Sequence, residues 1–237
     1  MDGEIMKAQA IEVYKAEGAE AVVAYLRELK TELTPAEHVQ LFSDVMRYAY
    51  WDEKNLTAAI QLGQAGIAFG EQMVQKHPDQ VEAIQSSVKG MYYDIASFTW
   101  PGWDEAGITI DDGQIQLGLA AAKDNLRLAQ ELRKDPLPCS RAHWLLAVQE
   151  MAARQYEQAK RNFQQAEMLA RQAEAEGEAL LADGFVAVVG LLENPDDERL
   201  KAKLEDVRKT LRPMDHGKFF IAQLFDSLRI FQSLSIE

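Results

Sequence analysis

The sequence predicts an all-α protein, because three features favour helices along the whole chain. Apolar residues recur three and four positions apart, which is the period of an amphipathic helix. Helix-start signals precede many of these segments. No segment shows the sustained two-residue alternation, bounded by turns, that a half-buried strand would show. The pattern predicts about eleven helices, near residues 3–16, 19–31, 35–50, 53–76, 80–98, 112–134, 141–153, 156–175, 178–192, 196–211 and 217–235.

Capping boxes predict the starts of three helices. In such a box, a side chain at the N-cap and one three positions later each bond the other residue's backbone N–H. Pro35 strengthens the first of these starts, because proline is favoured at the first helical position. The boxes are expected at Thr34–Glu37, Asp79–Glu82 and Asp111–Gln114.

Single capping residues predict three further starts. Asp52 can cap the fourth helix while Trp51 and Leu56 form a hydrophobic staple across that cap. Ser140 is the expected cap of the seventh helix, and Asn194–Pro195 marks the start of the tenth. The turns between successive helices are short, so neighbouring helices are expected to form antiparallel hairpins.

Length, charge and cysteine content narrow the class of protein. The 237 residues can build a sizeable core, and 47% of them are hydrophobic, which disfavours wholesale disorder. The formal net charge of −13 would repel nucleic acid and anionic membranes and attract a basic partner. A single cysteine, Cys139, excludes an intramolecular disulfide. No signal peptide or membrane-spanning run is visible, so the expected location is cytoplasmic.

One helical pair carries a repeat-like pattern of large and small side chains. Leu146 and Ala147 on the first helix precede an aromatic, small, aromatic, small series on the second, namely Tyr156, Ala159, Phe163 and Ala166. Residues 140–173 resemble the tetratricopeptide repeat in this respect. The tryptophan of that repeat is displaced by one position, to Trp144, and its closing proline is absent. The resemblance implies a solenoid of antiparallel helix hairpins, wound as a right-handed superhelix with a concave binding face.

The same pattern predicts one domain, residues 1–237, with a loop inserted at about 98–112. Gly90 and Tyr93 stand where the repeat family places a small and an aromatic residue. The small residues Ala147 and Ala159 are 12 positions apart, whereas Gly90 and Ala122 are 32 apart. About twenty residues are therefore inserted in the middle hairpin, and a connection of that length tends to be functional or disordered.

The inserted loop is the first candidate binding site. Pro101 takes Trp100 out of helical geometry, so the preceding helix must end there. The candidate contact residues are Trp100, Trp103, Asp104 and Glu105, which would form an aromatic and acidic lip on a groove. The alternative is a structural plug, in which both tryptophans fold back over the hairpin and each contributes on the order of 3 kcal/mol.

The predicted concave face supplies the second candidate site. In the best-matching repeat the resemblance implies that Arg141, Trp144, Val148 and Met151 face inward. These positions lack the lysine and asparagine with which some members of the family bind acidic peptide tails. An apolar or basic peptide segment is therefore the expected ligand.

No catalytic or metal-binding pattern is found, and no cofactor is expected. The histidines His38, His77, His143 and His216 lie far apart in sequence, and none forms a ligand-spaced pair. The acidic loop lacks the spacing of a calcium loop, and Cys139 has no basic neighbour to activate it.

Two helices carry unusual faces. Gly63, Gly66 and Gly70 share one face of the fourth helix, and the expected reason is close approach of another helix. The helix at 217–235 is apolar over more than half its circumference, so it either inserts against the preceding pair or forms a homodimer with a second copy. Its widest apolar row comprises Phe220, Leu224, Leu228, Phe231 and Leu234, and Phe219 extends it.

These observations predict a non-catalytic helical-repeat scaffold that binds a protein or peptide. Two alternatives are open. One is a small-molecule sensor or enzyme with a closed apolar pocket beneath Trp100 and Trp103 and a carboxylate of raised pKa. The other is a structural subunit that associates with itself through the 217–235 helix.

Overall fold

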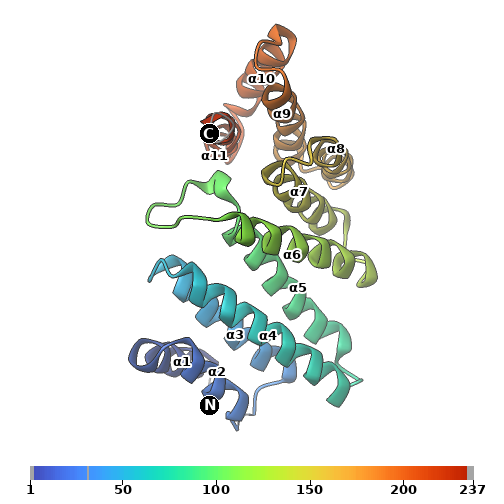
Figure 1. Cartoon of the computed structure of the whole chain (residues 1–237). Helices are drawn as coiled ribbons and strands as arrows, with labels where there is room; N and C mark the ends of the chain where they lie inside the picture. The colour runs from blue at the N-terminus through green and yellow to red at the C-terminus, as the bar shows by residue number, and fades with distance from the viewer. Residues whose placement is uncertain (1–2, 31, 234–237) are drawn as a thin grey trace. The chain divides into compact units, whose positions relative to one another are not determined.

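The computed structural model describes residues 3–30 and 32–233, and this part of the chain is built from helices. It contains eleven α-helices, one short 3-10 helix and no strand, so the all-α prediction is confirmed for the described residues. The elements are α1 (Gly3–Glu17), α2 (Ala19–Glu28), α3 (Pro35–Trp51), α4 (Leu56–Lys76), α5 (Val81–Phe98), η1 (Pro101–Trp103), α6 (Asp112–Glu131), α7 (Pro136–Ala152), α8 (Tyr156–Gln172), α9 (Glu176–Glu193), α10 (Glu198–Leu211) and α11 (Gly217–Ser233) (Figure 1).

The helices fall into two compact units, which are described one at a time. Unit 1 spans Met1–Thr99 and unit 2 spans Trp100–Glu237. The division falls inside the loop segment 98–112 that the sequence sets apart from its surroundings. The single helical-repeat domain expected from the sequence stays a prediction.

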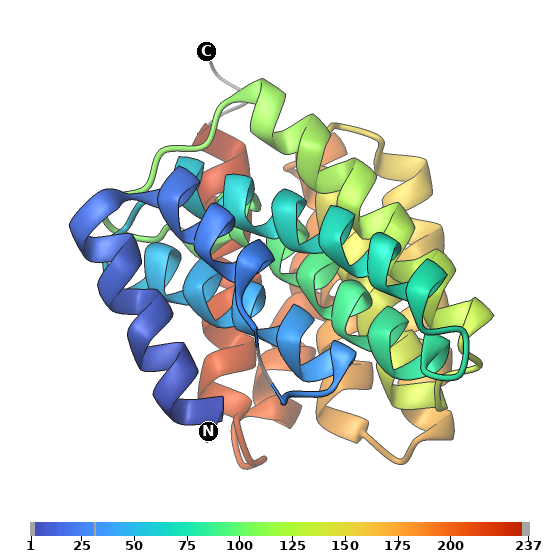
Figure 2. The ribbon, with the colours of Figure 1, turned by 90° about the horizontal axis from the view of Figure 1, so that it is seen from below.

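In unit 1 each helix packs against its neighbours in the chain and the next but one. The hairpin of α1 and α2 lies against α3, and α3, α4 and α5 contact one another (Figure 2). The core side chains come mainly from these last three helices and include Phe42, Met46, Leu62, Met91 and Ile95.

The glycines of α4 allow both of its neighbours to come close. A Cβ at Gly63 would lie 2.9 Å from Met46 Sδ on α3 and 3.0 Å from Ile95 Cδ1 on α5. At Gly66 it would lie 2.5 Å from Met91 Sδ, again on α5. Contacts this short leave no room for a methyl group, so the expected reason for the glycine row, close helix approach, is confirmed.

His38 is a buried polar group in the core of unit 1. Its Nε2 lies 2.6 Å from the carbonyl oxygen of Leu26, which can only accept, so Nε2 carries the proton of the neutral ring. The ring also packs against Phe69, with centroids 4.8 Å apart. Burial lowers the pKa of His38, and the bond to Leu26 opposes that shift only in part.

We expect unit 1 to lose stability when the pH falls below about 6.5, the ordinary pKa of histidine. In that range the unfolded chain takes up a proton at His38 that the folded chain refuses, so acidification favours unfolding. The loss stops once the pH is below the lowered pKa of the folded state. Urea unfolding of the parent and of His38→Gln at pH 7.5 and 5.5 measures the effect. An equal pH dependence in the two proteins would contradict it.

In unit 2 the helices from α6 to α10 contact each other in chain order, and α11 returns to pack on α9, α10 and η1. Glycines again allow close approach. A Cβ at Gly184 of α9 would lie 2.8 Å from Leu224 of α11, and one at Gly177 would lie 3.0 Å from Phe220. The apolar face of α11 is thus inserted against the preceding helices over Leu224 and Phe231, which are buried. Leu234 lies outside the described residues, and the homodimer stays a prediction.

Two of the three predicted capping boxes are confirmed. The Thr34 side chain accepts from Glu37 N, and the Asp111 side chain accepts from Gln114 N, each with the reciprocal bond in place. The box at Asp79–Glu82 is wrong, because α5 begins at Val81 after Gln80, whose side chain makes no capping bond.

The other three predicted starts are also wrong. Asn55, rather than Asp52, caps α4, and its Oδ1 accepts from Ala58 N at 3.0 Å. Asp197, rather than Asn194–Pro195, caps α10. The helix α7 begins a turn before Ser140, whose hydroxyl donates instead to Ala166 O of α8 at 2.7 Å.

Candidate functional site

The segment between α5 and α6 positions its two tryptophans through local backbone geometry. Trp100 is extended, with φ −94° and ψ 117°, and Pro101 then begins the short helix η1. A Cβ at Gly102 would overlap the indole of Trp100, so only glycine lets this turn close over the ring. Asp104 ends the turn in the left-handed region, at φ 49°.

Trp100 is the centre of an aromatic cluster in unit 2. It is 1% exposed, and its ring centroid lies 4.8 Å from that of Trp103, 5.6 Å from that of Trp144 and 6.2 Å from that of Phe185. Phe185 continues the cluster to Phe163, whose ring is stacked on it at 4.9 Å. These contacts join η1 to α7, α8 and α9. Trp100 therefore packs as a buried structural residue, as the plug alternative for the loop expects.

Trp103 forms the surface end of this cluster together with Phe219 of α11. The two rings are nearly parallel, at 15°, with centroids 6.3 Å apart. Trp103 is half-buried, whereas Phe219 is 55% exposed. We call these two residues the Trp103–Phe219 surface. It presents aromatic area to solvent on a short helix and a long helix that contact each other.

Charged side chains border the Trp103–Phe219 surface. Asp104 Oδ2 lies 3.1 Å from an Arg229 guanidinium nitrogen, and Asp226 lies 3.7 Å from the same nitrogen. All three side chains are largely exposed, and exposed ion pairs contribute at most about 1 kcal/mol. The aromatic contacts, more than the ion pair, therefore hold α11 against η1.

Buried polar atoms without a hydrogen-bond partner occur in the described part of unit 2. Among them are the indole nitrogens of Trp100 and Trp144, Oε1 of Gln223 and the hydroxyl oxygen of Ser227. Leaving a buried donor or acceptor unsatisfied costs about 1–3 kcal/mol. Such groups are uncommon in native proteins, and each calls for an explanation.

The structure brings together part of the site that the sequence predicts. Trp100, Trp103 and Trp144 are in mutual ring contact, and Asp104 lies at their exposed edge through its pair with Arg229. Glu105 follows Asp104 and is half-buried.

The remaining predicted contacts of α7 lie elsewhere. Val148 and Met151 are 0% exposed, so they belong to the core and have no surface with which to touch a ligand. Their expected inward position places them against neighbouring helices instead of along an open groove. Arg141 forms a two-pronged ion pair with Glu178 of α9, the shorter contact being 2.7 Å.

Sequence reasoning missed Phe219 as a site residue. It placed this residue at the edge of the apolar face of the last helix, but nothing in the local pattern relates it to Trp103, more than a hundred residues earlier. The sequence signal that could have drawn attention to it is the Phe219–Phe220 pair, since one helix cannot point two adjacent rings into the same contact.

Two buried carboxyl groups, Glu150 in unit 2 and Asp94 in unit 1, have a raised pKa. Burial raises the pKa of Glu150 on α7, and a hydrogen bond from Asn162 Nδ2 at 2.8 Å partly offsets it. Asn162 Oδ1 in turn lies 2.8 Å from His143 Nδ1, so this network joins α7 to α8. In unit 1, burial raises the pKa of Asp94 despite the Arg47 Nε at 2.8 Å.

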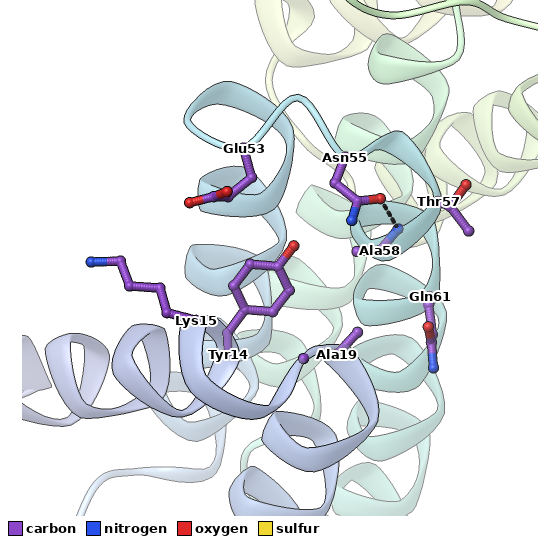
Figure 3. A pocket seen from close by; sticks show the side chains of 9 residues that line it. Tyr14, Lys15, Ala19, Glu53, Asn55, Thr57, Ala58 and Gln61 are labelled. Atoms are coloured by element: carbon purple, nitrogen blue, oxygen red, sulfur yellow. Dashed lines mark hydrogen bonds between the residues drawn. The ribbon is translucent and has the colours of Figure 1, made fainter.

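Unit 1 contains a polar pocket of about 510 Å³ that the sequence did not reveal (Figure 3). Tyr14, Lys15, Glu53, Asn55 and Gln61 line it, with Gly18 between α1 and α2. Burial, followed by the charge of Glu53, raises the pKa of Tyr14.

Three of the polar side chains around this pocket, Lys15, Glu53 and Asn55, already have partners within the chain. Lys15 Nζ lies 2.9 Å from Glu12, and Glu53 accepts from the Tyr48 hydroxyl at 2.8 Å. Asn55 is occupied as the cap of α4. The pocket can admit a small polar molecule, but no side chain points to a particular ligand.

A second depression in unit 1 is mostly apolar. It lies along the α1–α2 hairpin and is lined by Ile5, Ala8, Val13 and Tyr25 among others, with a volume of about 780 Å³. Its charged lining residues are Glu4 and Glu12, and Glu12 is paired with Lys15.

The described residues contain neither a metal-binding cluster nor a membrane-spanning helix. No group of three or more histidine, cysteine, aspartate or glutamate side chains is placed to share a metal ion within residues 3–30 and 32–233. None of the helices described there combines the length and apolar character that crossing a bilayer requires.

Comparisons with known proteins add no relative. No family model, no curated protein and no solved structure matches this chain.

Proposed function

We propose that this chain is a non-catalytic binding protein whose ligand is a peptide segment of another protein, contacted at the Trp103–Phe219 surface. The observation that carries this proposal is the pair of nearly parallel rings, one of them 55% exposed, of which Trp103 contacts the buried Trp100 and Phe219 lies on α11. Exposed aromatic rings on ordered supports are typical of protein interfaces, where a few large residues provide most of the binding energy.

The arrangement of helices supports a tetratricopeptide-like solenoid as the scaffold. In the pair that resembles this repeat, five of the six residues of the pattern are buried, namely Leu146, Ala147, Ala159, Phe163 and Ala166, and Tyr156 is half-buried. From α6 to α10 each helix contacts the next one in the chain. Such arrays bind extended partners along their faces and ends.

Charge favours an apolar segment that carries basic residues. The chain has a formal net charge of −13, and the loop beside the surface contributes Asp104, Glu105, Asp111 and Asp112. Arg229 neutralises only part of this charge through its pair with Asp104. A basic partner would therefore be attracted, and an acidic one repelled.

We expect Phe219→Ala to weaken peptide binding about tenfold or more while leaving the fold intact. Truncation of an aromatic residue at the energetic centre of an interface costs about 2 kcal/mol or more of binding energy. The ring is 55% exposed, so its loss removes little core packing. The probe is an array of octapeptides in which Arg alternates with Leu, Ile, Val or Phe, and calorimetry then gives the affinity of the best binder. A second array replaces Arg by Glu.

Met168→Ala is the matched control. Met168 is an apolar side chain of α8 that is 54% exposed, similar to the exposure of Phe219. This variant should bind like the parent. Equal binding by Phe219→Ala and the parent, or preference for the Glu array, would overturn the proposal. Light scattering on the same samples gives the mass and thus tests the homodimer.

A further inference from the structure

Four of the unsatisfied polar atoms of unit 2 come from two places, the Trp100–Trp144 pair and α11. The indole nitrogens of Trp100 and Trp144 come from the start of the η1 segment and from α7, and both can only donate. Oε1 of Gln223 and the hydroxyl of Ser227 come from α11, and both can accept. The side chains of Trp100, Gln223 and Ser227 are all more than nine-tenths buried.

Helix geometry shows which way the polar side chains of α11 face. Phe219 contacts Trp103 of η1, whereas Phe220 and Leu224 contact the glycines of α9. Gln223 and Ser227 follow Phe219 at intervals of four, and at about 100° per residue they lie on the arc between these two contacts. That arc faces the space between η1 and α9, where the rings of Trp100, Trp144 and Phe185 lie.

The two indole N–H groups can donate, and the Gln223 and Ser227 oxygens can accept. Because these four groups are unsatisfied, together they complement the hydrogen-bonding groups of a peptide main chain. Each residue of an extended segment offers a carbonyl oxygen, which an indole N–H can bind, and an N–H, which an amide or hydroxyl oxygen can bind. A purely apolar ligand would leave all four atoms unpaired. An anionic ligand could use the indoles and the Ser227 hydroxyl but would place its charge against Oε1 of Gln223, which can only accept.

We propose that the seam between α11 and the Trp100–Trp144 pair is where an extended peptide segment binds, with its main chain hydrogen-bonded to Trp100, Trp144, Gln223 and Ser227. This inference rests on the proposed peptide-binding function and specifies how the same site recognises its ligand. Apolar side chains of the segment meet the Trp103–Phe219 surface at the mouth of the seam, and basic side chains meet the acidic loop.

Entry of the segment requires α11 to move away from η1. The contacts that resist this movement are the exposed Asp104–Arg229 ion pair and the Trp103–Phe219 stack. The contacts of Phe220 and Leu224 with α9 lie on another side of the helix and can remain. The unsatisfied atoms already weaken the closed seam, so a ligand that satisfies them recovers part of that cost.

Ser227→Ala tests this inference with two readouts that move in opposite directions. In the free protein the variant loses a buried hydroxyl that has no partner and gains a better helix former, so its melting temperature should rise. Its affinity for the best Arg-alternating octapeptide should fall about fivefold to tenfold, since one hydrogen bond to the ligand is lost. Gln223→Met should lower the affinity to a similar extent. A merely structural serine would instead give a lower melting temperature and unchanged affinity.

Ser233→Ala is the matched control on the same helix. Ser233 is exposed, and its hydroxyl donates to Ile230 O at 2.7 Å, so this variant should bind like the parent. The second control is the same octapeptide with N-methyl groups on its main chain, which keeps every side chain but removes the N–H donors. It should bind the parent at least tenfold more weakly and should lose little further affinity in Ser227→Ala.

The outcomes separate the two proposals. Binding that depends on Phe219 but not on Ser227, Gln223 or the peptide N–H groups overturns the seam and leaves the surface proposal standing. Absence of binding by every octapeptide of the array overturns both. A lower melting temperature of Ser227→Ala overturns the seam whatever the binding data show. Tight binding of a small planar molecule that depends on Ser227, without peptide binding, would assign the seam to another class of ligand.

Discussion

Replacing Trp100 by alanine is expected to lower the free energy of unfolding of unit 2 by about 3–5 kcal/mol. The side chain is 1% exposed and contacts the rings of Trp103, Trp144 and Phe185, so its removal leaves a large cavity between η1, α7 and α9. The neighbouring rings are themselves held by other packing and can collapse into the space only in part. Urea unfolding, followed by the circular dichroism of the helices, measures the loss.

Trp51→Ala is the control for the Trp100 variant, because it removes the same side chain from an exposed position. Trp51 is 51% exposed and contacts Tyr50 and Phe98 through ring edges. Its loss should cost about 1 kcal/mol. If the two substitutions lowered the free energy of unfolding by similar amounts, Trp100 would not be a core residue and the aromatic cluster would not stabilise unit 2 as described.

Gly66→Ala is expected to lower the free energy of unfolding by about 2 kcal/mol, although alanine is the better helix former. The new Cβ would lie 2.5 Å from Met91 Sδ and 2.6 Å from Phe42 Cβ. Met91 can change its rotamer, but Phe42 Cβ is bonded to the backbone of α3, so the two helices must separate. Overpacking of this kind typically costs about 1–3 kcal/mol, more than the gain of about 1 kcal/mol in helix propensity.

Gly90→Ala provides the matched comparison within the same unit. Gly90 lies inside α5, and a Cβ there would have no atom within 4 Å, so alanine adds helix propensity without a clash. Its free energy of unfolding should rise by about 1 kcal/mol. Opposite signs for the two substitutions are the expected result of urea unfolding. If Gly66→Ala instead raised the free energy of unfolding, α3 and α5 would be able to move away from α4 at little energetic cost.

The fold class could be predicted from the sequence, but several helix starts could not. Capping residues are abundant in this chain, and two or more often lie within one turn. Asp135 and Ser140 both precede apolar residues of α7, and only Pro136, at the first helical position, favours the earlier start. With that start, Ser140 lies inside the helix and its hydroxyl donates to Ala166 O of α8. Asp52 and Asn55 compete in the same way before α4.

The ends of α6, α7 and α8 were harder to predict because no glycine follows these helices directly. The usual signal for an end is a glycine in the left-handed region just past the last turn. Here that conformation is taken by Arg133 after α6, Arg154 after α7 and Glu174 after α8, with φ values of 47°, 59° and 57°. Charged residues of this kind carry no stop signal, so the predicted ends of these helices lie up to three residues too late.

The candidate site was predictable only where its residues are close in the sequence. Trp100 and Trp103 stand out because two tryptophans and a proline interrupt a helical pattern. Phe219 joins them only through the return of α11 to η1, which no periodicity encodes. Val148 and Met151 were assigned to an open face by the resemblance, whereas contacts with neighbouring helices bury them.

The close approach of three indoles gives unit 2 its own spectroscopic signature. The ring centroids of Trp100, Trp103 and Trp144 lie 4.8, 5.6 and 6.2 Å apart, whereas the fourth tryptophan, Trp51, belongs to unit 1. At such separations the electronic transitions of the rings couple, and the resulting exciton bands depend on the mutual angles of the indoles. A molecule that shifts α11 or η1 would alter these bands before any helix unfolds. The exciton bands of the tryptophans would therefore report whether the seam is open or closed, without an added label.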